Sequence, residues 1–412
     1  MKKLTLEQWE KKYIAGPVKR FDQKYTMFAR PDWDMELRKR LKDWTFMGIA
    51  KDKPGYRLED IGLRRATGTA LMMLNAFNVS QPNSHSQAKA VVGALLSTLP
   101  FKPPPKPPEG TKANVTNTQK ITAIVKKVAR YFGADIIGIC KLDHRWVYSH
   151  SYEFNPFIVG ATEKPMGIHK VQEIPDEYQF AIVMGFSMDY NFYKYYNTSL
   201  GGAPTGLGYA QMGFTNLLVS EYIRNLGFNA IDCTTNDVAL TIPMAIQAGL
   251  GELGRNGLLI SPWFGPRLRI SKIITDLPLV PDTPIDFGVT DFCNVCKKCA
   301  DMCPLQSIIQ GDRTTEPLNV SNNSGVLKWP INAEGCRMYW AQVKRGGGCS
   351  TCIAVCPYNK VNTLPHRTVR WMSANFSWLN SFFVKMDDLF GYGKPKNPER
   401  FWEEWRPGKE YH

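Results

Sequence analysis

One short stretch of the sequence, residues 293–356, holds eight of the ten cysteines and constrains the fold more than any other feature. The first run contains Cys293, Cys296, Cys299 and Cys303, and the second contains Cys336, Cys349, Cys352 and Cys356. Within the first run and the last three cysteines of the second, two or three residues separate neighbours, and a proline ends each run. Thiolates at such spacings surround several corners of one metal centre before the chain turns away.

This spacing is typical of bacterial ferredoxins with two [4Fe–4S] clusters, in which the fourth cysteine of each run ligates the other cluster. By this rule we expect one cluster on Cys293, Cys296, Cys299 and Cys356, and a second on Cys303, Cys336, Cys349 and Cys352. A disulfide framework is typical of small secreted chains, whereas this chain has 412 residues. Zinc sites usually show two separated pairs of ligands, so the pattern favours iron–sulfur clusters.

Charge and hydropathy leave several partners open. Lysine and arginine number 51 against 37 acidic residues, a net charge of +14, which two clusters at about −2 each reduce to about +10. Such a surface suits anionic lipid, an acidic redox partner or nucleic acid, or serves solubility alone. No apolar run reaches 18 residues, so we expect no transmembrane helix. Arg64-Arg65 precedes an apolar stretch as in a twin-arginine signal, but its internal position favours an amphipathic helix.

We predict four parts along the chain. Residues 1–114 form a helical cap segment that ends in a proline-rich connector, with helical apolar spacing over 58–77 and 85–99. Residues 115–285 alternate helix and strand patterns and contain a glycine-rich loop, 201–208, before the helix that Gly227 caps. Residues 286–360 carry the clusters. The aromatic tail, 361–412, is expected to pack back onto the body.

Three further motifs are weaker. Gly249, Gly251 and Gly254 match the dinucleotide fingerprint, but a helical pattern precedes them and a strand pattern follows, the reverse of the strand–loop–helix order that the fingerprint requires. We therefore interpret them as a glycine turn beside a large planar or anionic cofactor. Cys140 and Cys233 lie in predicted strands and should be buried, inert thiols. No pair among the six histidines has metal-ligand spacing, and the Asp-x-His-x-x-Gly signature of a cobalt-ligating histidine is missing.

Taken together, the tyrosine that follows the glycine-rich loop, the segment 229–279 and the two cysteine runs resemble the reductive dehalogenases. The resemblance covers about residues 115–360. It implies an α+β fold: a nitroreductase-like corrinoid-binding domain followed by a ferredoxin-like domain with two [4Fe–4S] clusters. It also implies removal of halide from a small chlorinated alkane or alkene. The implied reaction is a two-electron, one-proton reduction at a base-off cob(I)alamin. This cobamide would receive its electrons from the two clusters.

The resemblance assigns three catalytic residues. Tyr209 matches the proton donor, because a phenol with an ordinary pKa of about 10 is protonated at neutral pH. Arg269 matches the arginine that stabilises the tyrosinate, with Arg267 in its place if the loop is shifted. Asn236 matches the polar residue that positions substrate or halide.

Further residues follow from the same resemblance. Aromatic pocket walls are expected from Tyr339, Trp340 and Phe28. Contacts to the corrinoid are expected from Thr241, Gly249, Leu250, Gly254, Asn256 and Gly257. Members of the family are exported folded and held at the outer face of the cytoplasmic membrane by a small anchor protein. They receive electrons from the quinone pool or a redox protein. Because no export signal is present in this sequence, we interpret the chain as a mature form. The sequence leaves its oligomeric state open.

Two other functions compete with this interpretation. Epoxyqueuosine reductases share the corrinoid and both clusters and act on tRNA, which the basic charge would suit. That family typically has a carboxylate where Tyr209 stands, so we expect no nucleic-acid partner. A pure electron carrier would leave residues 115–285 without a role.

Overall fold

The computed structural model describes residues 1–41, 51–77, 110–153, 167–196, 198–234, 237–342 and 349–406. The predicted helix over 85–99 and the proline-rich connector lie outside these residues, whereas the predicted helix over 58–77 is confirmed as α4 (Leu58–Phe77). Among the described residues, no helix has both the length and the apolar character needed to cross a membrane.

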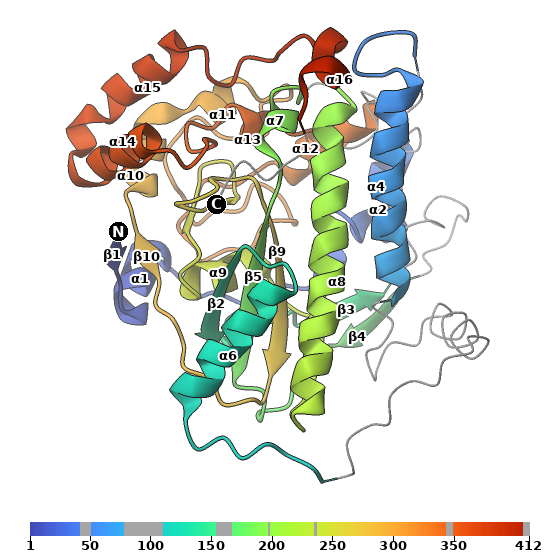
Figure 1. Ribbon diagram of the computed structural model, residues 1–412, viewed down its shortest axis with the longest axis vertical. Helices are drawn as coiled ribbons and strands as arrows, with labels where there is room; N and C mark the ends of the chain where they lie inside the picture. Colours follow the sequence, from blue (N-terminus) through green and yellow to red (C-terminus); the bar gives the residue numbers. More distant parts are fainter. Residues whose placement is uncertain are drawn as a thin grey trace.

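A four-stranded antiparallel sheet forms the centre of the molecule (Figure 1). Its strands in spatial order are β2 (Ile136–Lys141), β5 (Phe180–Ser187), β9 (Leu268–Thr275) and β6 (Ala230–Cys233). Residues 181–186 of β5 are all buried, which explains the continuous apolar pattern of this strand. Cys140 and Cys233 are buried in β2 and β6, as predicted.

Helices cover both faces of the sheet. On one face, α6 (Thr118–Tyr131) and α8 (Ala203–Asn225) pack against alternate residues of β5, among them Ile182 and Met184. On the other face, α9 (Thr241–Gln247) packs against Ala181 and Val183. The alternation follows from the two-residue period of a strand. The expected α+β class is confirmed.

The glycine-rich segment is not a loop, which corrects the prediction. Residues 200–202 form the short 3-10 helix η4 (Leu200–Gly202), and α8 begins directly after it, so Tyr209 lies within a helix. The glycines serve close packing: a Cβ at Gly206 would lie 2.6 Å from the Thr67 hydroxyl of α4, which runs alongside α8 (Figure 1). Gly227, with φ of +83°, follows the C-terminus of α8 as predicted.

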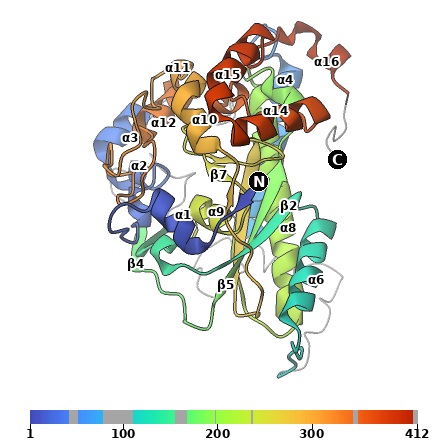
Figure 2. The same cartoon turned by 90° about the vertical axis from the view of Figure 1, so that its left-hand side faces the viewer.

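The ends of the chain pack around the cluster-binding region. Near the N-terminus, β1 (Lys2–Lys3) pairs with β10 (Ile285–Asp286), and α1 (Leu6–Tyr13) begins with a capping box at Thr5. Figure 2 shows α14 (Leu364–Asn375) and α15 (Asn380–Leu389) at the same end of the molecule as α10 (Val289–Cys296), which α15 contacts. Part of the aromatic tail packs on the body, where α16 (Phe401–Glu404) buries Phe401 against Phe192 and Tyr195.

The remaining described elements are η1 (Gln23–Tyr25), α2 (Arg30–Trp33), α3 (Met35–Leu41), η3 (His144–Trp146), β3 (His150–Glu153), β4 (Ile168–Val171), α7 (Tyr190–Tyr193), β7 (Glu252–Leu253), β8 (Leu259–Ile260), α11 (Lys298–Asp301), α12 (Ala333–Gln342), α13 (Thr351–Ala354), η5 (Ser377–Leu379) and η6 (Pro398–Arg400).

We predict that Gly138→Ala destabilises the protein. A Cβ at Gly138 in β2 would lie 2.1 Å from the backbone carbonyl oxygen of Ala248, so α9 would have to move off the sheet. Overpacking of this kind costs about 1–3 kcal/mol, which lowers the thermal unfolding midpoint of the holoprotein. The control is Gly62→Ala on the exposed side of α4, where a Cβ meets nothing within 4 Å and the midpoint should hold or rise. Equal midpoints for both variants would contradict this packing.

Candidate active site and cluster-binding region

The eight cysteines of the two runs come together as two groups of four. One cavity is lined by Cys293, Cys296, Cys299 and Cys356. The sharp turn between α10 and α11 makes this possible, because Lys297 takes a left-handed conformation with φ of +48° and returns the chain toward the cavity. In the other group, Cys336 of α12 and Cys352 of α13 interact electrostatically with Cys303 and Cys349. The grouping is that of the predicted crossing.

Crowded thiols of this kind favour binding of iron, whose positive charge offsets that of the thiolates. Burial raises the pKa of Cys293 to about 12 and that of Cys336 to about 12, and the neighbouring cysteines of each group add to the shift. Burial and, to a smaller extent, the neighbouring cysteines therefore disfavour the thiolates of Cys293 and Cys336 in the absence of a metal. Iron removes this penalty by ligating the thiolates, so each group of four fits a [4Fe–4S] cluster.

Arg255 supports the first group, a role that no sequence motif indicates. Its guanidinium is buried and donates to the backbone carbonyl oxygens of Cys293 (3.0 Å), Ile309 (2.8 Å) and Gly311 (2.9 Å). It also lies 4.6 Å above the Trp329 ring. A fixed positive charge at this position holds the cysteine loop and offsets the negative charge of a bound cluster.

Tyr209 and Arg269 meet as the resemblance implies. Arg269 of β9 donates from Nη1 to the Tyr209 hydroxyl at 3.1 Å, and its guanidinium lies 4.8 Å from the Tyr209 ring centre. Burial lowers the pKa of Arg269, but Tyr209 and Tyr193 outweigh that effect and raise it above its ordinary value. Gly208 makes room for the pair, because a Cβ there would lie 2.8 Å from Cγ of Arg269.

A second tyrosine, Tyr193, also interacts with Arg269, and no sequence motif indicates this contact. It is buried, it interacts with Arg269, and its hydroxyl lies 3.0 Å from Sδ of Met188. Met188 and Tyr193 belong to an apolar cluster that Cys352 and Cys299 also contact. The tyrosine–arginine site and the cysteines thus share one packed interior.

Arg267, the alternative partner for Tyr209, binds backbone carbonyl groups. It is fully buried and donates to the backbone carbonyl oxygens of Met188 (2.9 Å) and Lys360 (3.2 Å). Arg267 therefore joins the sheet to the chain that follows the last cysteine, and Arg269 remains the partner of Tyr209. Asn236 lies outside the described residues.

Two of the three candidate aromatic residues of the pocket, Phe28 and Trp340, lie near each other. The Phe28 and Trp340 ring centres are 6.4 Å apart, and the Arg337 guanidinium lies 5.0 Å from the first and 5.2 Å from the second. Tyr339 interacts with Tyr196, which in turn interacts with Cys349. The N-terminal segment therefore reaches α12, which carries Cys336 of the second group.

The candidate corrinoid residues are spread over a turn that packs against protein. Gly249 and Gly257 have positive φ, and a Cβ on them would meet Thr283 and Ile331 respectively. Of the other candidates, Leu250 is buried in the core, Gly254 and Asn256 line the cavity of the first cysteine group, and Thr241 accepts a hydrogen bond from the buried Lys272. Packing therefore accounts for these glycines, and contact with a corrinoid stays a prediction.

The cysteine-rich region matches a known family of iron–sulfur domains. Residues 292–359 match the family model described as a 4Fe-4S double cluster binding domain. The chain is thus an iron–sulfur protein with a domain for two [4Fe–4S] clusters, and its fold is similar to that of a solved structure, the catabolic reductive dehalogenase NpRdhA. That likeness has a TM-score of 0.70 at 22% identity and covers 98% of this chain and 50% of the other.

Curated sequences then identify the relatives. The chain is 36% identical over 305 residues to the tetrachloroethene reductive dehalogenase of Sulfurospirillum multivorans. This alignment covers 70% of this chain and 60% of that protein. It is 35% identical over 321 residues to the tetrachloroethene reductive dehalogenase of Desulfitobacterium hafniense, with coverage of 71% and 57%. The chain is a relative of the reductive dehalogenases, as its motifs indicated, and spans about 60% of the length of these curated proteins. An epoxyqueuosine reductase of Lactococcus garvieae aligns over only 147 residues, 32% of this chain, at 29% identity.

The crossing of the two groups can be tested with Cys303→Ser. We expect this variant to lose or convert the cluster that Cys336, Cys349 and Cys352 would hold, because Cys303 lies with them despite belonging to the first run. EPR spectra of the reduced protein should keep one cluster signal and change the other. Cys140→Ser, in the central sheet, is the control and should keep both signals. Matching changes in Cys303→Ser and Cys293→Ser would show that the run, and not the crossing, sets the ligands.

Proposed function

We propose that this protein is a reductive dehalogenase that removes halide from a small chlorinated alkane or alkene. The observation that carries the proposal is the hydrogen-bonded pair of Tyr209 and Arg269, in contact with the interior that the cluster cysteines share. The chlorinated ethene in the names of the related proteins supports the substrate class. The overall reaction is R–X + 2e⁻ + H⁺ → R–H + X⁻.

The cofactor we propose is a cobamide bound base-off, together with two [4Fe–4S] clusters. One of the structural relatives is described as performing B12-dependent dehalogenation, and this sequence lacks the motif that would supply a histidine to cobalt. When bound, the corrinoid supplies the reducing centre for the carbon–halogen bond. Of this chain, the interior beside Tyr209 and the candidate turn at 249–257 are the parts proposed to hold it.

Tyr209 would donate the proton. Its hydroxyl already accepts a hydrogen bond from Arg269, whose positive charge stabilises the tyrosinate that remains after transfer. The helix α8 and the strand β9 fix the two side chains from separate elements, so the donor is held at one position without substrate. Asn236 is proposed to orient the substrate or halide.

Substrate contact is proposed for Phe28, Tyr339 and Trp340. Aromatic walls exclude water and favour an apolar halocarbon. Electrons would arrive singly through the two clusters, and Cys349 of the second group interacts with Tyr196, which also interacts with Tyr339. The physiological donor would be the quinone pool or a redox protein.

A peripheral position at the outer face of the cytoplasmic membrane, with a small anchor protein, completes the proposal. The support in this structure is an apolar surface on α14 and α15 and the turn between them. Its exposed side chains are Leu364, Trp371, Trp378, Phe382, Leu389 and Phe390. Aromatic side chains of this kind suit the interface of a bilayer or the apolar face of an anchor.

Metal content tests the cofactors. We expect the purified holoprotein to contain about eight iron atoms and one cobalt per chain, measured by inductively coupled plasma mass spectrometry. The iron follows from the two groups of four cysteines. Eight irons without cobalt, in cells supplied with corrinoid, would contradict the dehalogenase proposal and leave an electron carrier.

Tyr209→Phe tests the proton donor. Loss of a general acid lowers turnover by about 10²–10⁴-fold, so we expect a loss of this size in chloride release from tetrachloroethene with reduced methyl viologen. Iron and cobalt content should not change. Tyr222→Phe on the same helix is the matched control and should retain activity, because this residue packs in the core beside α6. Near-normal turnover of Tyr209→Phe would exclude the donor role. Activity of the parent protein on an epoxyqueuosine stem–loop, with none on the halocarbon, would favour the tRNA enzyme.

A further inference from the structure

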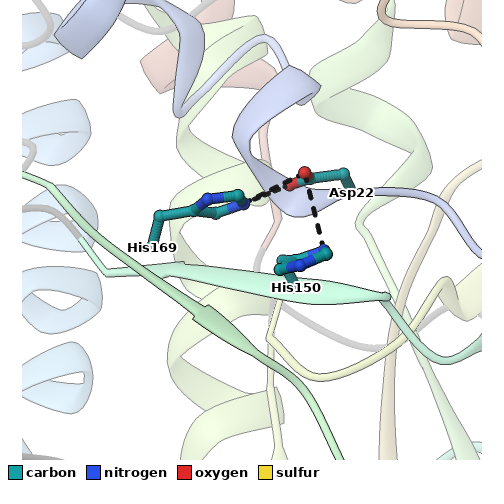
Figure 3. Close-up of side chains that lie close together, drawn as sticks. All are labelled: Asp22, His150 and His169. Carbon is teal, nitrogen blue, oxygen red and sulfur yellow. Dashed lines mark hydrogen bonds and ion pairs between the residues drawn. The ribbon is translucent and has the colours of Figure 1, made fainter.

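A cluster of two histidines and an aspartate lies on the hairpin of β3 and β4, away from the tyrosine–arginine site. Asp22 of the N-terminal segment faces His150 of β3 and His169 of β4 (Figure 3). In the hairpin, Tyr152 is opposite His169 and His150 is opposite Val171, so the two histidines are diagonal neighbours on one face. A backbone bridge between Asp22 and His150 brings the carboxylate alongside.

The side chains already converge on one point. The imidazole rings are stacked with centres 4.6 Å apart and planes 26° apart. Nε2 of His169 lies 3.0 Å from Oδ2 of Asp22, and Nδ1 of His150 lies 3.7 Å from the same oxygen. One ligand atom from each residue fits within 4.8 Å of the others. Ligands at about 2.0–2.2 Å around tetrahedral zinc are about 3.3 Å apart, so small side-chain rotations would complete the geometry.

Neighbouring groups hold the carboxylate in place and leave an open side. Oδ1 of Asp22 accepts a hydrogen bond from the Lys24 backbone at 3.0 Å, which fixes the aspartate at the start of η1. Two groups compete with a metal: Nζ of Lys24, 4.0 Å from Oδ2, and the Ser149 hydroxyl, 3.1 Å from Nδ1 of His150. Both can turn outward. The side chains of His150 and His169 are 38% and 34% exposed, so water can reach the fourth position.

We propose that Asp22, His150 and His169 bind one Zn²⁺ ion. Two neutral imidazoles and one carboxylate are a common ligand set for zinc and leave the site with a net charge of +1. The ion would tie the N-terminal segment to the hairpin, where Tyr152 and the Gly167 backbone already donate to Asp32 at 2.7 Å each. Its role would be structural, and the site does not depend on the proposed dehalogenase activity.

Zinc binding to the intact holoprotein provides the test. Holoprotein treated with chelator, incubated with zinc sulfate and desalted should retain about one zinc per chain beyond its iron. His150→Ala and His169→Ala should each lower zinc affinity at least tenfold against a chromogenic chelator. His144→Ala, an exposed histidine six residues before His150, is the matched control and should bind as the parent protein does.

A second readout separates this site from zinc held by cysteines or by chance. Cu²⁺ bound in place of zinc should give an EPR spectrum with hyperfine splitting from two imidazole nitrogens, which Asp22→Asn retains in part and the double histidine variant loses. Iron content and the visible cluster spectrum should remain unchanged in every variant, which shows that the chain is folded. Failure of the parent protein to retain zinc, or equal retention by the double variant, would overturn the proposal and leave a plain histidine–carboxylate contact.

Discussion

The crowding of eight thiols into two groups of four is the constraint on which the rest of this structure depends. Burial raises the pKa of a thiol in each group, Cys293 in the first and Cys336 in the second, so iron has to compensate for the charge of the thiolates that ligate it. The surroundings are arranged for that charge. Arg255 anchors the loop of the first group, and Lys298 and Lys360 both contact Asp387 of the tail at 2.5 and 2.8 Å. Cluster loading and folding of this end of the chain are therefore coupled.

The strand β9 connects this region to the proposed chemistry. Arg267 directly precedes the strand, and Arg269 is the second residue of β9. The first donates to the backbone beside the clusters, and the second donates to Tyr209. The start of β9 thus sets the separation between the cluster-binding region and the proposed proton donor.

Local patterns in the sequence predicted the local structure well. The cysteine spacing indicated the double-cluster domain, and the apolar runs indicated β5, β6 and α4, because these signals depend on near neighbours. The glycines before Tyr209 predict a loop but lie in helices, since their close packing against Thr67 and Arg269 depends on residues distant in the sequence. Tyr209 and Arg269 could be paired only through the family resemblance. Nineteen positions separate His150 from His169, so no spacing rule could join them, and only the hairpin register does so.

The close approach of α4 and α8 has a consequence for changing the substrate range. The Thr67 side chain occupies the space beside Gly206, one helical turn before Tyr209. A bulkier residue at position 67 would push on α8 and displace the phenol without touching it. Libraries that randomise only the proposed pocket walls would leave this contact unchanged, whereas paired changes at positions 67 and 206 would move the proposed proton donor relative to the substrate.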